Sequence, residues 1–207
     1  NDYDPESTQK DGISAIAFDI TYPLFDKVTL YSQVARLLGE IHDPANTSSM
    51  IDLGWGAVPV GVRAKLGPIN LLAEYRMSSE RFLFNYWDRS YDVNRVVLGD
   101  DREPITREGQ LYQYGKLSGF YIQGNMSVMN MLTLEMGYQN MQGEKWVDSG
   151  STGEYQAGES NQTFLSTIRI NPSIIPKVGK AEAFYQQSNA PNPFKFTPNA
   201  STIWGYN

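Results

Sequence analysis

Charged side chains recur at every second position along several segments of this chain in which apolar and polar residues alternate. Arg63 and Lys65 form one such pair, and Glu74 and Arg76 form another. Because successive side chains of a β-strand point to opposite faces of a sheet, this spacing puts both members of a pair on one face. Charges of opposite sign on neighbouring strands can then pair across a water-filled interior.

The residues expected to line this interior are the charged side chains on the polar faces of predicted strands. They are Asp19, Arg63, Lys65, Glu74, Arg76, Glu135, Arg169, Lys180 and Glu182. Because charged rings line the permeation paths of pores, these residues are candidates for a solute path. A plugged interior, in which the charges only satisfy one another, is equally compatible with the pattern. The mixed signs argue against strong selectivity for anions or for cations.

Catalytic and metal-binding chemistry receives little support from the sequence. The chain has no cysteine and one histidine, His42, which argues against a zinc or iron site and leaves a serine hydrolase a single choice of histidine base. The acidic groups within 2–11 and 100–103 do not have the spacing of a calcium-binding loop. We therefore expect no enzyme activity, no catalytic residues, no cofactor and no metal site.

Composition excludes two further classes of protein. The net charge of −6 argues against a nucleic-acid partner, since proteins that bind nucleic acids carry basic faces. The hydrophobic share is 41%, and no stretch approaches the ~18 consecutive apolar residues that a membrane helix needs. A helical membrane protein is therefore excluded, whereas membrane-crossing strands, which are only half apolar, are not.

Period-two alternation predicts strands over residues 12–24, 27–38, 53–66 and 69–77, and later ones around 120–128, 132–139, 164–171 and 180–186. A ninth strand begins at Thr202. The apolar face of the third strand is predicted to carry Val58, Val60 and Val62, opposite Arg63 and Lys65. These apolar faces are almost free of charge over about ten residues, so they point either to lipid or to a packed interior.

The strands are joined in an asymmetric way that favours the lipid alternative. Short turns are expected at 23–26, 67–68, 128–130 and 172–177, and long polar segments at 40–52, 79–116, 141–162 and 188–201. Short turns at one end and long loops at the other, joined by strands long enough to cross a bilayer, are typical of transmembrane β-barrels.

The hairpin pattern, the aromatic-rich loops and turns such as Lys65-Leu66-Gly67-Pro68 resemble Gram-negative outer-membrane β-barrel proteins, the porin-like class in the wide sense. The resemblance implies an all-β fold, an antiparallel up-and-down transmembrane β-barrel with short periplasmic turns and long extracellular loops. It also implies a bacterial outer-membrane location with membrane lipid as partner.

Strand direction leads to an expectation about completeness. If the short turns are periplasmic, the first strand runs inward from the external side, whereas complete bacterial barrels start and finish in the periplasm. We therefore expect residues 1–207 to form a single β-barrel domain that is incomplete at both ends, an internal piece of a barrel of ten or more strands.

The segment 81–95 is the densest aromatic and charged run in the chain. In porin-like proteins a long loop can fold into the lumen and narrow it. By that resemblance Trp87, Asp88, Arg89, Asp92 and Arg95 are expected to form a constriction or entrance loop. A loop folded over the rim, with its aromatic side chains packed on strand ends, remains open as an alternative.

Three functions are compatible with these patterns. The first is an outer-membrane channel, or porin, for small polar solutes. The second is a structural barrel that anchors other outer-membrane or surface proteins through its long loops. The third is a soluble, lipocalin-like barrel that encloses one apolar ligand.

Overall fold

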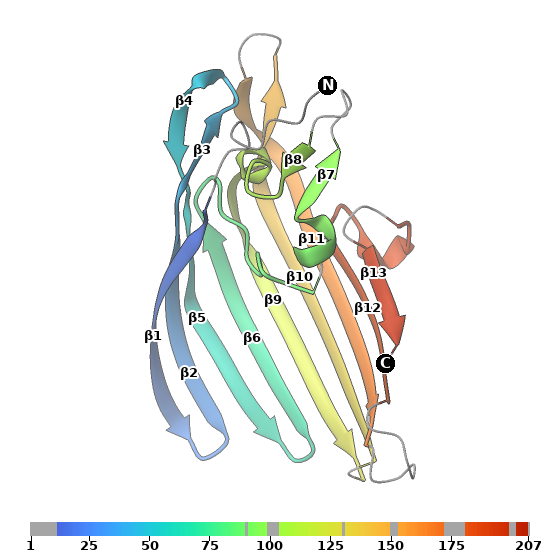
Figure 1. Ribbon diagram of the computed structural model, residues 1–207. Helices are drawn as coiled ribbons and strands as arrows, with labels where there is room; N and C mark the ends of the chain where they lie inside the picture. The colour runs from blue at the N-terminus through green and yellow to red at the C-terminus, as the bar shows by residue number, and fades with distance from the viewer. Residues whose placement is uncertain are drawn as a thin grey trace.

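One large antiparallel sheet dominates the computed structural model, which describes residues 12–89, 91–98, 104–129, 131–149, 153–171, 181–198 and 202–206. Its nine strands lie side by side in chain order (Figure 1), as β1 (Ser14–Phe25), β2 (Val28–Leu38), β5 (Trp55–Leu66), β6 (Ile69–Ser78), β9 (Tyr114–Val128), β10 (Leu132–Asp148), β11 (Gly153–Ile170), β12 (Ala181–Ala190) and β13 (Thr202–Tyr206). The predicted all-β, antiparallel, up-and-down arrangement is therefore confirmed. The sheet itself is open, with β1 and β13 as its edges.

Short turns join the strands at one end of the sheet. β1 and β2 are joined at Asp26 and Lys27, and β5 and β6 at Gly67 and Pro68. Gly67 has a φ of +61°, a left-handed conformation that glycine adopts at no steric cost. The turn expected at 172–177 lies outside the described residues, as does Asn130 of the turn between β9 and β10.

At the opposite end of the sheet, β-strands occupy two of the segments predicted to be long polar loops. Residues 40–52 form a hairpin of β3 (Glu40–Asp43) and β4 (Asn46–Asp52), and β10 and β11 continue through most of 141–162. The prediction of a loop over 141–162 was wrong. Tyr155, Trp146 and Tyr112 pack edge to face there, which supports the extended hairpin above the rest of the sheet.

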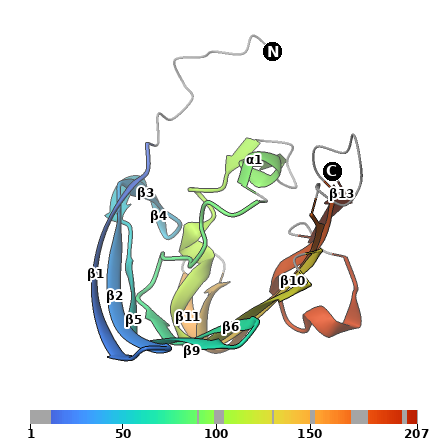
Figure 2. The same ribbon diagram turned by 90° about the horizontal axis from the view of Figure 1, so that it is seen from below.

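The described residues of segment 79–113 fold back over the sheet instead of extending away from it. It contains α1 (Tyr91–Asn94), β7 (Val96–Leu98), β8 (Pro104–Thr106) and η1 (Leu111–Gln113). Figure 2 shows the sheet curving into an open arc with α1 on its concave side. Buried side chains of this segment join those of β2, β3 and residue 53 in one apolar core near the loop end, comprising Leu37, Ile41, Leu53, Phe82, Leu83, Tyr86 and Leu111.

The distribution of side chains over the two faces of the sheet is the reverse of that in a protein with an apolar interior. On the convex face Val60, Ile122 and Met136 are 58%, 49% and 59% exposed. On the concave face Arg76 and Glu182 are only 6% and 7% exposed. The predicted separation of apolar and charged side chains onto opposite faces is therefore confirmed for these strands. No helix among the described residues is long and apolar enough to cross a membrane.

Val58 departs from the predicted face. Its side chain is 2% exposed and lines the concave side together with Phe82, whereas Val60 lies on the convex face. The pairing of β5 with both neighbours shifts between residues 57 and 61, a bulge that adds one residue at Pro59. A one-residue shift exchanges the faces of all preceding side chains. Uninterrupted alternation would put Trp55 on the same face as Arg63, but with the bulge Trp55 lies on the convex face.

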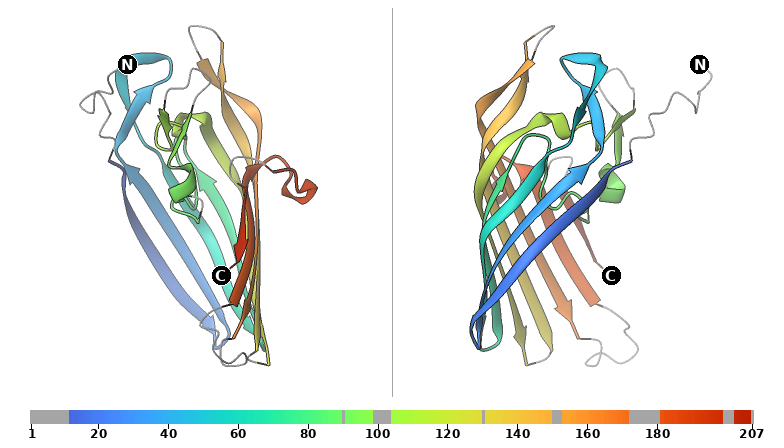
Figure 3. Two further views of the ribbon diagram at one scale, coloured as in Figure 1. Left: turned by 45° about the vertical axis from the view of Figure 1, so that its right-hand side comes forward. Right: turned by 90° about the vertical axis from the view of Figure 1, so that its left-hand side faces the viewer.

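An aromatic cluster covers part of the convex face towards the loop end. The short helix η3 (Pro193–Lys195) follows β12 and projects from the outside of the sheet (Figure 3, left). The ring centroid of Phe194 lies 5.2 Å from that of Tyr138 and 5.5 Å from that of Phe164. The ring centroids of Phe196 and Tyr185 are 5.7 Å apart. The cluster therefore joins strands β10, β11 and β12 to the segment that follows them.

Gly61 provides a test of the packing on the concave face. A Cβ at this position would lie 2.4 Å from the ring of Tyr31, so Gly61→Ala should displace that ring and lower the free energy of unfolding by about 1–3 kcal/mol. The control is Gly124→Ala, because the nearest atom there is the end of the flexible Leu71 side chain at 3.3 Å. Urea unfolding followed by far-UV circular dichroism measures both. Equal stability of the two variants would contradict the assigned packing.

Candidate functional site

One buried ion pair on β6, with polar and aromatic side chains of neighbouring strands around it, lies on the concave face. Arg76 contacts Glu74 at 2.6 Å, and both side chains are over nine-tenths buried. The guanidinium also donates to Gln139 and lies 3.9 Å from the ring centroid of Tyr121. The hydroxyl of Tyr31 donates to Glu74. Cation–π contacts of this kind stabilise a desolvated guanidinium by up to about 2 kcal/mol.

A second group of charges lies on β10, β11 and β12. Arg169 contacts Glu182 at 2.7 Å and Glu135 at 3.6 Å. Glu135 in turn accepts a 2.7 Å hydrogen bond from Gln123. Cross-strand pairing of Arg169 with Glu182 and of Glu135 with Thr167 brings these side chains together from three successive strands. The structure thus joins three of the predicted residues in one network.

The remaining predicted strand residues occupy more open positions. Asp19 is exposed on the edge strand β1, opposite Gln33. Arg63 lies over the ring of Tyr31 with its guanidinium carbon 4.4 Å from the centroid, and Lys65 is exposed near the short-turn end. Lys180 lies outside the described residues. Of the predicted residues, Glu74, Arg76 and Glu182 therefore have buried side chains, whereas Asp19, Arg63 and Lys65 are exposed.

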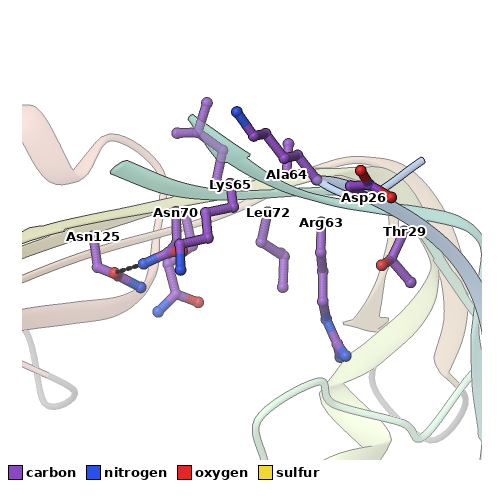
Figure 4. A pocket seen from close by; sticks show the side chains of 11 residues that line it. Asp26, Thr29, Arg63, Ala64, Lys65, Asn70, Leu72 and Asn125 are labelled. Atoms are coloured by element: carbon purple, nitrogen blue, oxygen red, sulfur yellow. Dashed lines mark hydrogen bonds between the residues drawn. The ribbon is translucent and has the colours of Figure 1, made fainter. Parts of the chain in front are cut away.

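Arg63 and Lys65 border a cavity of about 450 Å³ at the short-turn end of the sheet. Figure 4 shows Thr29, Arg63 and Leu72 pointing to the same side of the sheet there. Asn70 and Asn125, joined by a 2.9 Å hydrogen bond, continue the polar lining. Leu72 is the one apolar residue that breaks the alternation of β6, and it faces this cavity together with Arg63.

Segment 81–95 is attached to the concave face by charged residues. Arg89 contacts Glu182 of β12 at 3.1 Å and lies 4.8 Å from the centroid of the Phe184 ring. Asp88 accepts a 2.7 Å hydrogen bond from Gln186 and contacts Arg107 at 3.3 Å. The loop therefore folds inside the arc, while its Phe82 and Tyr86 pack in the core at the strand ends. Elements of both sequence-based alternatives are present in one loop.

A cavity of about 320 Å³ lies between this loop and the inner wall of β9, β11 and β12, and we call it the loop cavity. Trp87, Asp88 and Arg89 line it from the loop side, and Thr163 and Gln186 line it from the wall. Asp92 and Arg95 are exposed and do not line it. The five residues predicted for an entrance loop are therefore split, with three at the cavity and two away from it.

Several contributors to the site were missed from the sequence. The predicted charges are contacted by Tyr31, Tyr121, Gln123 and Gln139. Arg107 forms an ion pair with Asp88. The strand residues could have been found from alternation alone, since each lies on the same face as a predicted charge. Arg107 had no such signal, because it belongs to the irregular segment before η1.

The chain matches no protein-family model and no curated protein. Within the described ranges, no three residues among His, Asp and Glu are grouped in a way that could hold a metal ion. The described side chains of the site make hydrogen bonds, ion pairs and contacts with aromatic rings.

Tyr86 offers a pH-dependent test of the loop position. Burial raises the pKa of its phenol, and the nearby carboxylate of Glu108 raises it further. An unfolded tyrosine has a pKa of about 10. The contribution of Tyr86 to the free energy of unfolding should therefore be present below that pH and be lost as the pH rises towards the pKa of Tyr86 in the folded protein. Thermal unfolding between pH 8 and about 12 should show a smaller alkaline loss of stability in Tyr86→Phe than in wild type.

Ultraviolet absorbance of tyrosinate gives an independent check of the same point. In the folded protein, Tyr86→Phe should remove one residue from the group that titrates late. Loss of a residue from the group that titrates near pH ~10 would mean that Tyr86 is not buried in the core.

Proposed function

We propose that this chain forms the wall of a bacterial outer-membrane β-barrel that passes small polar solutes. The observation that carries the proposal is the inverted burial: an exposed aliphatic convex face opposite a buried, charged concave face. In water such an apolar surface is unfavourable, whereas in a bilayer it replaces contact with water by contact with acyl chains. The charged face would then line an aqueous interior.

The aromatic cluster around η3 supports a membrane location. Tyr138, Phe164 and Tyr185 lie on the convex face towards the loop end, with Phe194 and Phe196 packed beside them. Aromatic side chains gather where a barrel leaves the hydrocarbon region, because their rings suit the headgroup level. In the proposed orientation the cluster marks the outer interface, and the short turns face the periplasm.

A closed barrel requires strands in addition to the nine described. Nine antiparallel strands leave β1 and β13 running in the same direction. Antiparallel closure therefore needs an odd number of further strands, and it would satisfy the backbone groups on both edges.

The structural, anchoring function is the second candidate, and the attached loop favours it. Asp88 and Arg89 hold segment 81–95 inside the arc, where it fills part of the concave side. A barrel with such an interior can be too occluded to conduct. The lipocalin-like alternative fits the inverted burial less well, since a binder of apolar ligands keeps its aliphatic side chains inside.

Substitutions on opposite faces of neighbouring strands test the membrane location. Val60→Arg should lower the free energy of unfolding from lipid vesicles by about 2–4 kcal/mol if Val60 lies near the bilayer midplane. The matched control is Leu72→Arg, which places the same charge on the concave face opposite Arg63 and should cost about 1 kcal/mol or less from the like charge across the strands. Urea titration of vesicle-inserted protein measures both. Folding in plain buffer, with Val60→Arg neutral, would exclude a membrane barrel.

Conductance separates the channel from the anchor. Single channels of the wild-type protein in planar bilayers should pass current, and Arg89→Ala should raise the conductance because it removes the ion pair that holds the loop to Glu182. The control Arg36→Ala removes an exposed ion pair to Asp52 and should leave conductance unchanged. Wild-type protein that stays closed at all voltages would favour the anchoring function.

A further inference from the structure

The loop cavity has the size and the wall of a small-molecule site. Its volume of about 320 Å³ lies near the lower end of the ~300–1,000 Å³ range of ligand pockets. One side is formed by the loop with Phe84 and Trp87, and the other by Tyr121, Thr163 and Gln186 of three different strands. Aromatic side chains and hydrogen-bonding groups therefore line one partly open cavity.

Charges around the loop cavity are already neutralised by one another. Arg107 contacts Asp88, and Arg89 contacts Glu182. Arg169 lies between Glu182 and Glu135, so three arginines face three carboxylates. A charged solute would have to displace a partner from one of these pairs. Arg107 and Asp88 are both largely buried, so separating them is costly. A neutral solute avoids this penalty.

The hydrogen-bonding groups in the wall suit a solute with many hydroxyls. Asp88 is an acceptor, and the guanidinium of Arg89 offers donors. The amide nitrogen of Gln186 already donates to Asp88 and Ser188, so its side-chain oxygen is offered as an acceptor, and Thr163 is both donor and acceptor. Hydroxyls also act as both donors and acceptors, so one ring of them can satisfy all of these groups. The C–H face of the same ring can pack on Trp87, whose side chain is half exposed.

We infer that the loop cavity binds a neutral sugar ring of monosaccharide size. The inference rests on the proposed function, because it assigns the class of solute that the channel would admit. Phe84 and Trp87 supply the apolar platform, and Asp88, Arg89, Thr163 and Gln186 supply the polar contacts. Recognition depends on these side chains and not on whether the barrel conducts.

Tryptophan fluorescence of the detergent-solubilised protein tests this binding directly. The chain has four tryptophans, of which Trp87 lines the cavity and Trp204 lies exposed on β13. D-glucose should give a saturable change in emission that is lost in Trp87→Phe and kept in Trp204→Phe. No saturable change in the wild-type protein, or a change that persists in Trp87→Phe, would overturn the inference.

Two neighbouring threonines provide a matched pair of variants. Thr163 and Thr167 lie on the same face of β11 and are both buried, but only Thr163 lines the cavity. Loss of one hydrogen bond should weaken glucose binding about fivefold in Thr163→Val and leave it unchanged in Thr167→Val. Equal weakening in the two variants would overturn the assignment of the site.

Charged analogues of the same ring test the neutrality of the site. D-glucuronate and D-glucosamine should bind more weakly than D-glucose, and tighter binding of either would overturn the inferred class. Planar-bilayer recordings separate this inference from the channel: glucose binding without conductance would support the site and reject the channel. Conductance without a glucose response would keep the channel and reject the sugar site.

Discussion

Every charge buried on the concave face has to find a partner there, and the rest of the structure depends on this constraint. Arg76 meets it through Glu74, Gln139 and the ring of Tyr121, which come from β6, β10 and β9. Replacing a buried ion pair by apolar groups is often neutral, but removing one partner costs about 3–5 kcal/mol. Such a network therefore adds little net stability, yet it opposes register changes that would separate its members.

The same constraint explains how an irregular segment comes to lie inside the arc. Glu182 is held by Arg169 from β11 and by Arg89 from the loop, so one wall carboxylate links a strand to segment 81–95. Asp88 links the loop to Gln186 of β12 and to Arg107. The backbone of the segment has separate partners: Arg81 accepts from Gly54 and donates to Tyr114, and Arg95 accepts from Arg107. The apolar core around Phe82 and Leu111 fixes its other end.

Strand positions and faces could be predicted where alternation is uninterrupted, as in β9 and the first half of β10, and also in β6, where Leu72 alone interrupts it. The prediction failed at Val58 because a bulge adds a residue without any change in composition, and Pro59 was the only local sign of it. It failed over 141–162 because exposed strands of a long hairpin are polar on both faces and resemble a loop. Contacts such as Arg89 with Glu182, 93 residues apart, depend on the path of the loop and have no local signature.

The distribution of partners along the concave face also gives the interior a direction. At the short-turn end Arg63 and Lys65 border a cavity open to solvent, where bulk water can satisfy them. At mid-height Glu74, Arg76 and Glu182 are buried and paired, and the loop with its apolar core covers the far end. Desolvation of the charged side chains therefore increases from the turns to mid-height. If solutes pass along this face as proposed, they would meet Asp88 and Arg89 already bound to Gln186 and Glu182, so a solute has to offer better partners than those the wall supplies.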